Sequence, residues 1–392
     1  SFSELSLMIP QAGSLSAYTE KALGHFPAIL SVFSGYVVVA MFALSAELLL
    51  VNHLLGVLYP SMEGSSLVAF LILGAFTLLN LLGIDVFAKL QNVLAFSMVV
   101  ALTLLGVSAM TGGFAEHEFS SSAVFGNFSM DGGLLSLIAL AIWGYVGAEF
   151  VCPLIKEARN PEKHIPRSMY LGLTVIFIVF TLYCLGALYY LPQETLLTSG
   201  LPHLDYANAA FGGAGTLLLT VAAIAATCST LNTSLAAVPR MLQGMAEQGQ
   251  AFALLGKLTK ESRVPWVAVL IVSGVTGLPL LVWGNDPGTV GLLLISAAIA
   301  WLVSYVIAHV DVIALRLRYP EMTRPYRSPF YPLPQLIGIV GMVYAIIHAS
   351  PDPSLTGKIF MNAGVVLGVV SVIAVLWIKL VMKKSLFHPE PL

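Results

Sequence analysis

The chain has 392 residues, of which 58% are hydrophobic and only 10% are charged, with a mean hydropathy of +0.89 and a net charge of −2. Soluble globular domains carry about 25% charged residues, so this composition excludes a water-soluble protein and indicates a lipid bilayer as its surroundings. The slightly negative net charge argues against a nucleic-acid partner.

Apolar stretches long enough to cross a bilayer recur along the whole chain. A spanning helix needs about 20 mainly apolar residues. Ten stretches meet this requirement, and a further helix ends just before Pro10, so residues 1–392 are predicted to form one all-α transmembrane domain. The first stretch is too long for one upright crossing and should tilt or leave the bilayer. The expected spans are 26–59, 65–84, 92–111, 133–155, 168–191, 214–237, 265–284, 289–315, 334–349 and 359–381.

The basic residues divide the connectors between these spans into two sets. If the connector 10–25 is cytoplasmic, every second connector and the C-terminal tail are cytoplasmic too. Those segments, together with the last turn of the final span, which carries Lys379, hold all of the 18 Lys and Arg residues except Lys358. Cytoplasmic connectors of membrane proteins are enriched in Lys and Arg, so the pattern supports the span count and predicts a cytoplasmic C-terminus. The cytoplasmic set is 10–25, 85–91, 156–167, 238–264, 316–333 and the tail.

Glu47 lies near the middle of the first full span. An ionisable side chain at membrane depth costs about 2.5–3.5 kcal/mol or more and is usually functional. Two hypotheses remain for this carboxyl: a structural hydrogen bond to a neighbouring helix, or a part in proton coupling.

The segment from Trp143 to Gly147 interrupts the span 133–155 with two glycines and two aromatic side chains. Glycine weakens a helix by about 1 kcal/mol relative to Ala and permits backbone angles outside the helical range. Transporters use such breaks at mid-membrane because freed N–H groups can bind a carboxylate and freed carbonyls can bind an ammonium. The alternative is that Gly144 and Gly147 only permit close helix packing.

Glu149 follows this segment directly and is also expected at membrane depth. A carboxyl in that position usually faces a cavity, where it can act as a gate or carry a proton. A structural hydrogen bond to a neighbouring helix is the competing interpretation.

Hydroxyl side chains crowd into the span 214–237 around Ser229 and Thr230. Hydroxyl oxygens could bind a hard cation such as Na⁺. Such side chains also bond back to helix carbonyls and support tight packing, which is the alternative.

Other reactive side chains give no further candidates. The three cysteines, Cys152, Cys184 and Cys228, lie far apart in apolar runs without metal-binding or redox spacing. Asp311 is expected near the cytoplasmic end of its span, where it could reach the surface or pair with Arg316. We therefore expect no catalytic residue, no metal site and no cofactor apart from a coupling ion, H⁺ or Na⁺.

Several motifs together resemble one family of transporters, the amino acid–polyamine–organocation (APC) permeases. The pattern W-x-Y-x-G-x-E at 143–149, followed by E-x-R-N-P-x-x-x-I-P-R at 157–167, is similar to the sixth helix and following loop of that family. Matching landmarks recur in the family's order across most of the chain. They lie at 3–18, 80–91, 240–249 and 317–326.

The resemblance implies a LeuT/APC-type bundle of two inverted five-helix repeats plus two extra C-terminal helices. It implies a substrate site bounded by Trp143, Gly144, Tyr145, Val146 and Gly147, with Trp143 and Tyr145 as gate or stacking residues. Glu149 would belong to the gate or the proton pathway, and Ser229 and Thr230 occupy positions that bind Na⁺ in sodium-coupled relatives. The family's first helix and most of its second would precede residue 1, so we expect an N-terminally truncated bundle.

These observations predict a secondary active transporter in the cell membrane that moves amino acids or related small amines by alternating access and is coupled to H⁺. Na⁺ coupling and uncoupled exchange are the alternatives within the same fold. An intramembrane enzyme would need a convergent catalytic pair or zinc ligands, and no such motif occurs in the sequence. A receptor or structural membrane protein would have a continuous helix at 144–147.

Overall fold

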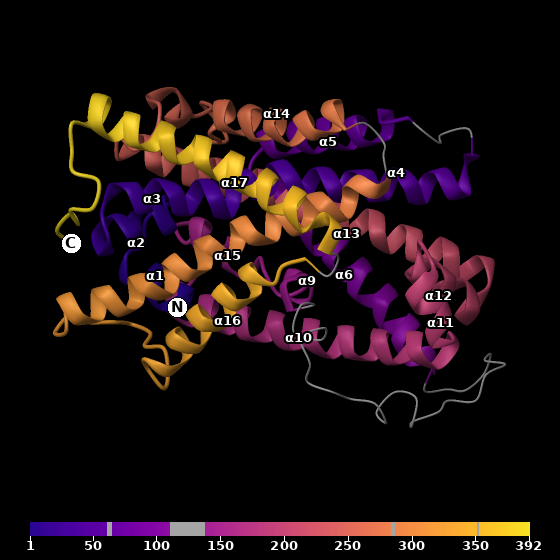
Figure 1. The fold of residues 1–392 in the computed structure, drawn as a ribbon. Coiled ribbons are helices and arrows are strands. Elements are labelled where there is room, and N and C mark those ends of the chain that lie inside the picture. Colours follow the sequence, from indigo (N-terminus) through magenta and orange to yellow (C-terminus); the bar gives the residue numbers. More distant parts are fainter. Residues whose placement is uncertain (61–64, 110–137, 284–286, 351–352) are drawn as a thin grey trace.

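The computed structural model describes residues 1–60, 65–109, 138–283, 287–350 and 353–392, and every regular element in these ranges is helical (Figure 1). The chain begins with α1 (Phe2–Met8), α2 (Leu15–Ala22) and α3 (His25–Val32). The next elements are η1 (Phe33–Val37), η2 (Ala40–Leu44), α4 (Ser45–Leu58), α5 (Leu67–Leu81) and α6 (Ile84–Ser108). Helix α1 ends at Met8 with Ile9 as its C-cap, where the sequence predicts the end of a helix before Pro10.

The second half of the chain continues the same architecture. It comprises α9 (Ile138–Trp143), η5 (Ala148–Leu154), α10 (Pro161–Tyr190), α11 (Gln193–Thr198), α12 (Pro202–Phe211) and α13 (Gly213–Glu247). After these come η6 (Ala253–Gly256), α14 (Trp266–Val282), α15 (Pro287–Arg318), α16 (Leu333–Ile347), α17 (Pro353–Leu376) and η7 (Trp377–Met382). Each predicted span coincides with one of these helices or with a set of consecutive ones. The first residues of the span 133–155, the last two of the span 92–111 and the last of the span 265–284 lie outside the described residues.

Six helices are long and apolar enough to cross a membrane, and three shorter apolar helices accompany them within the described part of the chain. The peripheral helices expose large apolar side chains along most of their length. Examples are Leu78, Phe96, Phe177, Val340 and Val369. Water-soluble monomers do not expose apolar surface on this scale, so these faces belong against lipid. The helical bundle is therefore a multi-pass membrane protein.

One long helical run extends from His25 to Gly56 and contains two π-helical segments. These segments, η1 and η2, are separated only by Val38 and Val39. A π-helical turn holds one residue more than an α-helical turn and often occurs at functional positions. The run is the most deeply buried of the long helices, and its apolar side chains form much of the core with those of α13, α14 and α15.

The connectors that carry Lys and Arg meet at one end of the bundle, which we call the basic end. Side chains and backbone groups of different connectors are hydrogen-bonded there. The pairs are Arg318 with the Lys21 and Ala22 carbonyls, Gln248 with Gln11, Ser262 with the Leu81 carbonyl, and Arg240 with Glu157. The C-terminal tail lies at the same end, and its Leu386 carbonyl accepts a hydrogen bond from the Phe26 N–H (Figure 1).

Asp311 and Arg316 do not pair, contrary to one interpretation of the sequence. Asp311 is fully buried and accepts a 2.6 Å hydrogen bond from the Thr19 hydroxyl of α2. Arg316 instead forms a bidentate ion pair with buried Glu4 of α1, at 2.7 and 2.6 Å. The expectation failed because hydropathy places a residue along the membrane normal but does not say which helix it faces.

At the basic end, Gly244 of α13 packs closely against the backbone of Gly13. An added Cβ at Gly244 of α13 would lie 2.2 Å from the Gly13 nitrogen and 2.5 Å from its Cα. Both are backbone atoms, so only glycine lets α13 pack this closely against the connector before α2.

Candidate functional site

The predicted helix break lies between α9 and η5. Helix α9 ends at Trp143, residues 144–147 are not helical, and the chain resumes at Ala148 as a 3₁₀ helix. Gly147 has φ of 103°, a left-handed conformation that favours glycine because it has no Cβ. The span is therefore discontinuous at the position that the glycines indicate.

The two glycines of the segment have different structural roles. An added Cβ at Gly144 would lie 2.3 Å from a ring atom of Phe180, so this glycine permits close packing against α10. No atom lies within 4 Å of an added Cβ at Gly147, where the backbone angle alone requires glycine. Gly144 thus fits the interpretation of close helix packing, and Gly147 fits the interpretation of an interrupted helix.

The break leaves peptide groups without partners. Within the part of the chain that the structure describes, no hydrogen bond is made to the carbonyls of Gly144, Tyr145 and Val146, and none from the Val146 N–H. Unpaired peptide groups at membrane depth are unfavourable unless water or a ligand satisfies them. These groups are available to bind a small polar molecule.

Glu149 is 2% exposed and is held by three donors. The Trp301 indole N–H donates to Oε1 at 3.0 Å, and the Tyr305 hydroxyl donates to Oε2 at 2.5 Å. The Gly147 N–H also donates to Oε2, at 3.0 Å, and lies 3.4 Å from the Tyr305 hydroxyl oxygen. The carboxyl therefore connects the backbone of the break to helix α15.

Aromatic rings pack around the residues that hold this carboxyl. Trp301 contacts Trp143 and Phe150 edge to face, at centroid distances of 5.5 and 5.9 Å. Phe150 contacts Tyr36 of η1 in the same manner at 5.4 Å. The Tyr145 ring is directed to the outer side of the break, where it packs against Phe180 at 6.1 Å.

A second group of predicted polar residues comprises Glu47 of α4 and the adjacent Ser229 and Thr230 of α13. The Thr230 hydroxyl lies close to the Glu47 carboxyl, and it donates a 3.1 Å hydrogen bond to the Ala226 carbonyl. The Ser229 hydroxyl accepts a 2.6 Å hydrogen bond from Gln91. Among the described residues, no hydrogen bond joins this group to Glu149. The two predicted acids thus belong to separate networks.

Trp301 and Tyr305 are the site residues that the sequence prediction missed. They lie four residues apart in the span 289–315, a spacing that places them on the same face of α15. That spacing is the one local signal for them, because aromatic residues in an apolar helix are otherwise interpreted as core.

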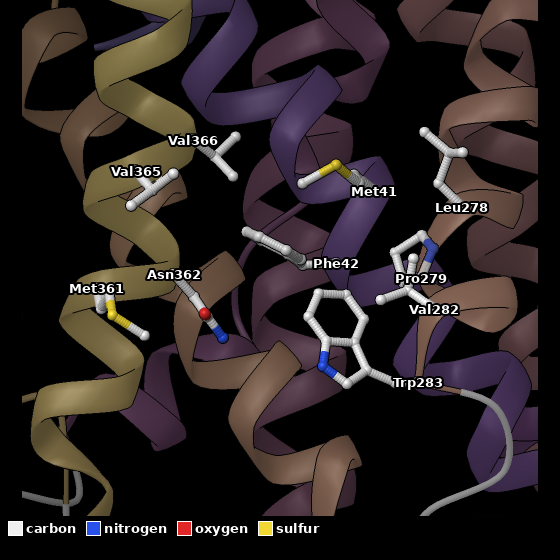
Figure 2. A pocket seen from close by; sticks show the side chains of 10 residues that line it. All are labelled: Met41, Phe42, Leu278, Pro279, Val282, Trp283, Met361, Asn362, Val365 and Val366. Atoms are coloured by element: carbon white, nitrogen blue, oxygen red, sulfur yellow. The ribbon is translucent and has the colours of Figure 1, made fainter.

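A separate apolar groove of about 410 Å³ lies between η2, α14 and α17 (Figure 2). Figure 2 shows Phe42, Trp283 and Asn362 directed toward the same space, and the other described residues of the lining are apolar apart from the Asn362 amide and the Trp283 indole N–H. This groove has no lining residue in common with the helix break at 144–147. An apolar wall of this kind cannot satisfy both charged ends of a zwitterion, so this groove is not the candidate substrate site.

A membrane-embedded helical bundle with an interrupted span, free peptide groups and a buried carboxyl beside them has the features of a secondary transporter. Comparison with known proteins identifies the family. The family model for amino acid permeases matches residues 1–389. The γ-aminobutyric acid permease of Escherichia coli K12 is 27% identical, over 97% of this chain and 84% of its own length.

Two further relatives show similar coverage. The serine/threonine exchanger SteT of Bacillus subtilis is 25% identical, over 88% of this chain and 77% of its own. The aromatic amino acid transport protein AroP of E. coli O6:H1 is 26% identical, over 91% of this chain and 80% of its own length. The chain therefore belongs to the amino acid permease family of the APC superfamily, whose members are membrane transport proteins and not enzymes.

Proposed function

We propose that this protein is a secondary active transporter that carries an amino acid or related small amine by alternating access, coupled to H⁺ through Glu149. The observation that carries the proposal is the shared Gly147 N–H, which lies within reach of both the Glu149 carboxylate and the Tyr305 hydroxyl. A proton on Glu149 would change the acceptor of this N–H and thereby the conformation of the break.

The proposed substrate site is the segment from Trp143 to Gly147. The relatives carry γ-aminobutyric acid, serine or threonine, and aromatic amino acids, which differ in their side chains but share an ammonium and a carboxylate. The carbonyls of Gly144, Tyr145 and Val146 can accept from an ammonium, and the Val146 N–H can donate to a carboxylate. This site would recognise the groups that all such substrates share, with Trp143 and Tyr145 as gate or stacking residues.

In this proposal ten segments cross the bilayer and the basic end faces the cytoplasm, together with the C-terminal tail. Glu47 is assigned a structural role, because its carboxyl lies close to the Thr230 hydroxyl and no hydrogen bond joins it to Glu149 among the described residues. The positive-inside rule supports the orientation, since the basic connectors are hydrogen-bonded to one another at one end.

Coupling to Na⁺ through Ser229 and Thr230 is the second candidate. Ser229 and Thr230 are adjacent in α13, and both offer hydroxyl oxygens. Their present contacts favour the structural alternative, since Ser229 accepts from Gln91 and Thr230 bonds back to the Ala226 carbonyl. Uncoupled exchange needs neither site, and a receptor or structural protein would not need the free peptide groups.

The decisive experiment measures uptake of a labelled amino acid panel into proteoliposomes, with pH and Na⁺ gradients imposed independently. We expect accumulation driven by the pH gradient. Glu149→Gln should abolish this accumulation while it preserves exchange of labelled for unlabelled substrate, because the site residues remain. The matched control is Glu194→Gln, an exposed residue of α11. Proton-driven accumulation that persists in Glu149→Gln would remove Glu149 as the proton carrier, and accumulation driven by Na⁺ alone would favour the second candidate.

A further inference from the structure

A second pocket, of about 190 Å³, lies at the basic end of the bundle, where α15 ends and the connector to α16 begins. Its lining includes three guanidinium groups together with a tyrosine and a proline. The residues are Arg316, Arg324, Arg327, Tyr331 and Pro320. Three arginines around a space of this size form a preorganised site for an anion.

The positive charge of this pocket is only partly neutralised. Glu4 is the one carboxylate that pairs with these guanidiniums among the residues that the structure describes. Both of its oxygens are already engaged by Arg316, and Oε2 also accepts from the Ser328 N–H. Three cations minus one anion leave two uncompensated positive charges at the pocket.

The pKa of Arg324 reflects this excess of positive charge. Burial lowers the pKa of Arg324, Glu4 opposes the shift, and the positive charges of Arg316 and Arg327 add to it. Arg316 is also fixed in place, because its guanidinium carbon lies 4.1 Å above the centre of the Tyr331 ring. A bound anion would relieve the repulsion between these fixed cations.

Arg327 is the arginine of the pocket that remains available. It is exposed, and it makes no hydrogen bond or ion pair with any residue in the described ranges. Arg324, by contrast, donates to the carbonyls of Met322, Leu315 and Tyr319. A ligand anion would therefore gain most from Arg327, and removal of that side chain would leave the fold intact.

Exposed apolar side chains are close in sequence to the lining residues. Leu317 follows Arg316, Phe330 precedes Tyr331, and Leu333 lies two residues after Tyr331; they are 74%, 83% and 57% exposed. The exposed apolar face continues along α16 through Ile337 and Val340. These side chains would contact acyl chains in a bilayer, so the pocket lies beside lipid and not beside water alone.

We propose that this pocket binds the phosphate of an anionic phospholipid head group, with the acyl chains of that lipid against Phe330 and α16. Basic pockets between spans at the cytoplasmic face suit such head groups, because guanidiniums bind phosphate oxygens bidentately. The exposed apolar side chains select a lipid over free phosphate. The site is independent of the proposed substrate site and of the coupling ion.

Native mass spectrometry of the purified full chain in detergent tests this proposal, with phosphatidylglycerol and phosphatidylcholine titrated separately. We expect preferential binding of phosphatidylglycerol, and we expect Arg327→Gln to weaken it about fivefold, since one Arg at a membrane surface contributes about that factor. The matched control is Arg159→Gln, an exposed arginine of another basic connector, which should bind phosphatidylglycerol as the unmodified chain does.

Three results would overturn the proposal. Equal binding of phosphatidylglycerol by Arg327→Gln and the unmodified chain would show that the pocket holds no head group. An equal loss in Arg159→Gln would show only general surface charge. If millimolar inorganic phosphate displaces the lipid, the pocket binds a free anion. The same conclusion follows if the protein retains inorganic phosphate when no lipid is present. Circular dichroism of each variant verifies that its helix content is unchanged.

Discussion

The Tyr305 hydroxyl donates a 2.5 Å hydrogen bond to Oε2 of Glu149, although 156 residues separate the two in sequence. Together with the Trp301 indole, it fixes the carboxyl beside the interrupted helix. Any movement of α15 relative to the break must change these bonds. In the proposed mechanism, the charge of Glu149 and the position of α15 would therefore depend on each other.

Trp301→Phe removes one donor to Glu149 while it preserves most of the ring packing against Trp143 and Phe150. We expect the free energy of unfolding to fall by about 1–3 kcal/mol, because a buried acceptor loses its partner. Denaturation in mixed micelles measures the change. The same substitution in a Glu149→Leu background, where no acceptor remains, should cost less, and an equal loss in both backgrounds would mean that the Trp301–Glu149 hydrogen bond contributes nothing.

Gly147→Ala tests the left-handed backbone at the break. An added methyl group meets no atom within 4 Å, so the expected loss of about 1–2 kcal/mol comes from the backbone angle alone. Gly172→Ala in α10 is the matched control, because it too has open space around the methyl group and has no positive φ. Thermal unfolding and uptake should be impaired in Gly147→Ala and not in the control. Equal behaviour of the two variants would argue that residue 147 does not need its left-handed conformation.

Glu47→Gln preserves the size of the side chain and an oxygen that can face Thr230. Since this carboxyl belongs to a network separate from Glu149, we expect uptake driven by a pH gradient to persist, with a stability change of less than about 1 kcal/mol. Proteoliposome uptake at several external pH values measures this. Loss of proton-driven accumulation in Glu47→Gln would transfer the coupling role from Glu149 to Glu47.

Gly244→Ala introduces a methyl group 2.2 Å from the Gly13 nitrogen, where the nearest atoms are backbone and cannot rotate away. Overpacking of this kind costs about 1–3 kcal/mol, and here it separates α13 from the connector before α2. The control is Gly274→Ala in α14, which faces open space. A lower melting temperature only in Gly244→Ala is the expected result, and tolerance of the methyl group would show that this contact can open without cost.

The helices were largely predictable, because a bilayer imposes a length and an apolar composition that each span displays in its own sequence. The break at 144–147 was predictable for a related reason, since glycine in an apolar helix is a local signal. The hydrogen-bond partners of Glu149 were not predictable from the sequence. Trp301 and Tyr305 resemble ordinary core residues, and only tertiary packing brings them into contact with Glu149. The pairing of Glu4 with Arg316 was missed for the same reason, with 312 residues between them.

The two π-helical segments in the run from His25 to Gly56 determine which way Glu47 faces. Each adds one residue to the helix, which turns everything that follows by about 100°. Together they rotate α4 through more than half a revolution relative to α3. An uninterrupted helix in this place would present the Glu47 carboxyl on nearly the opposite side, away from Thr230 and toward a different neighbour.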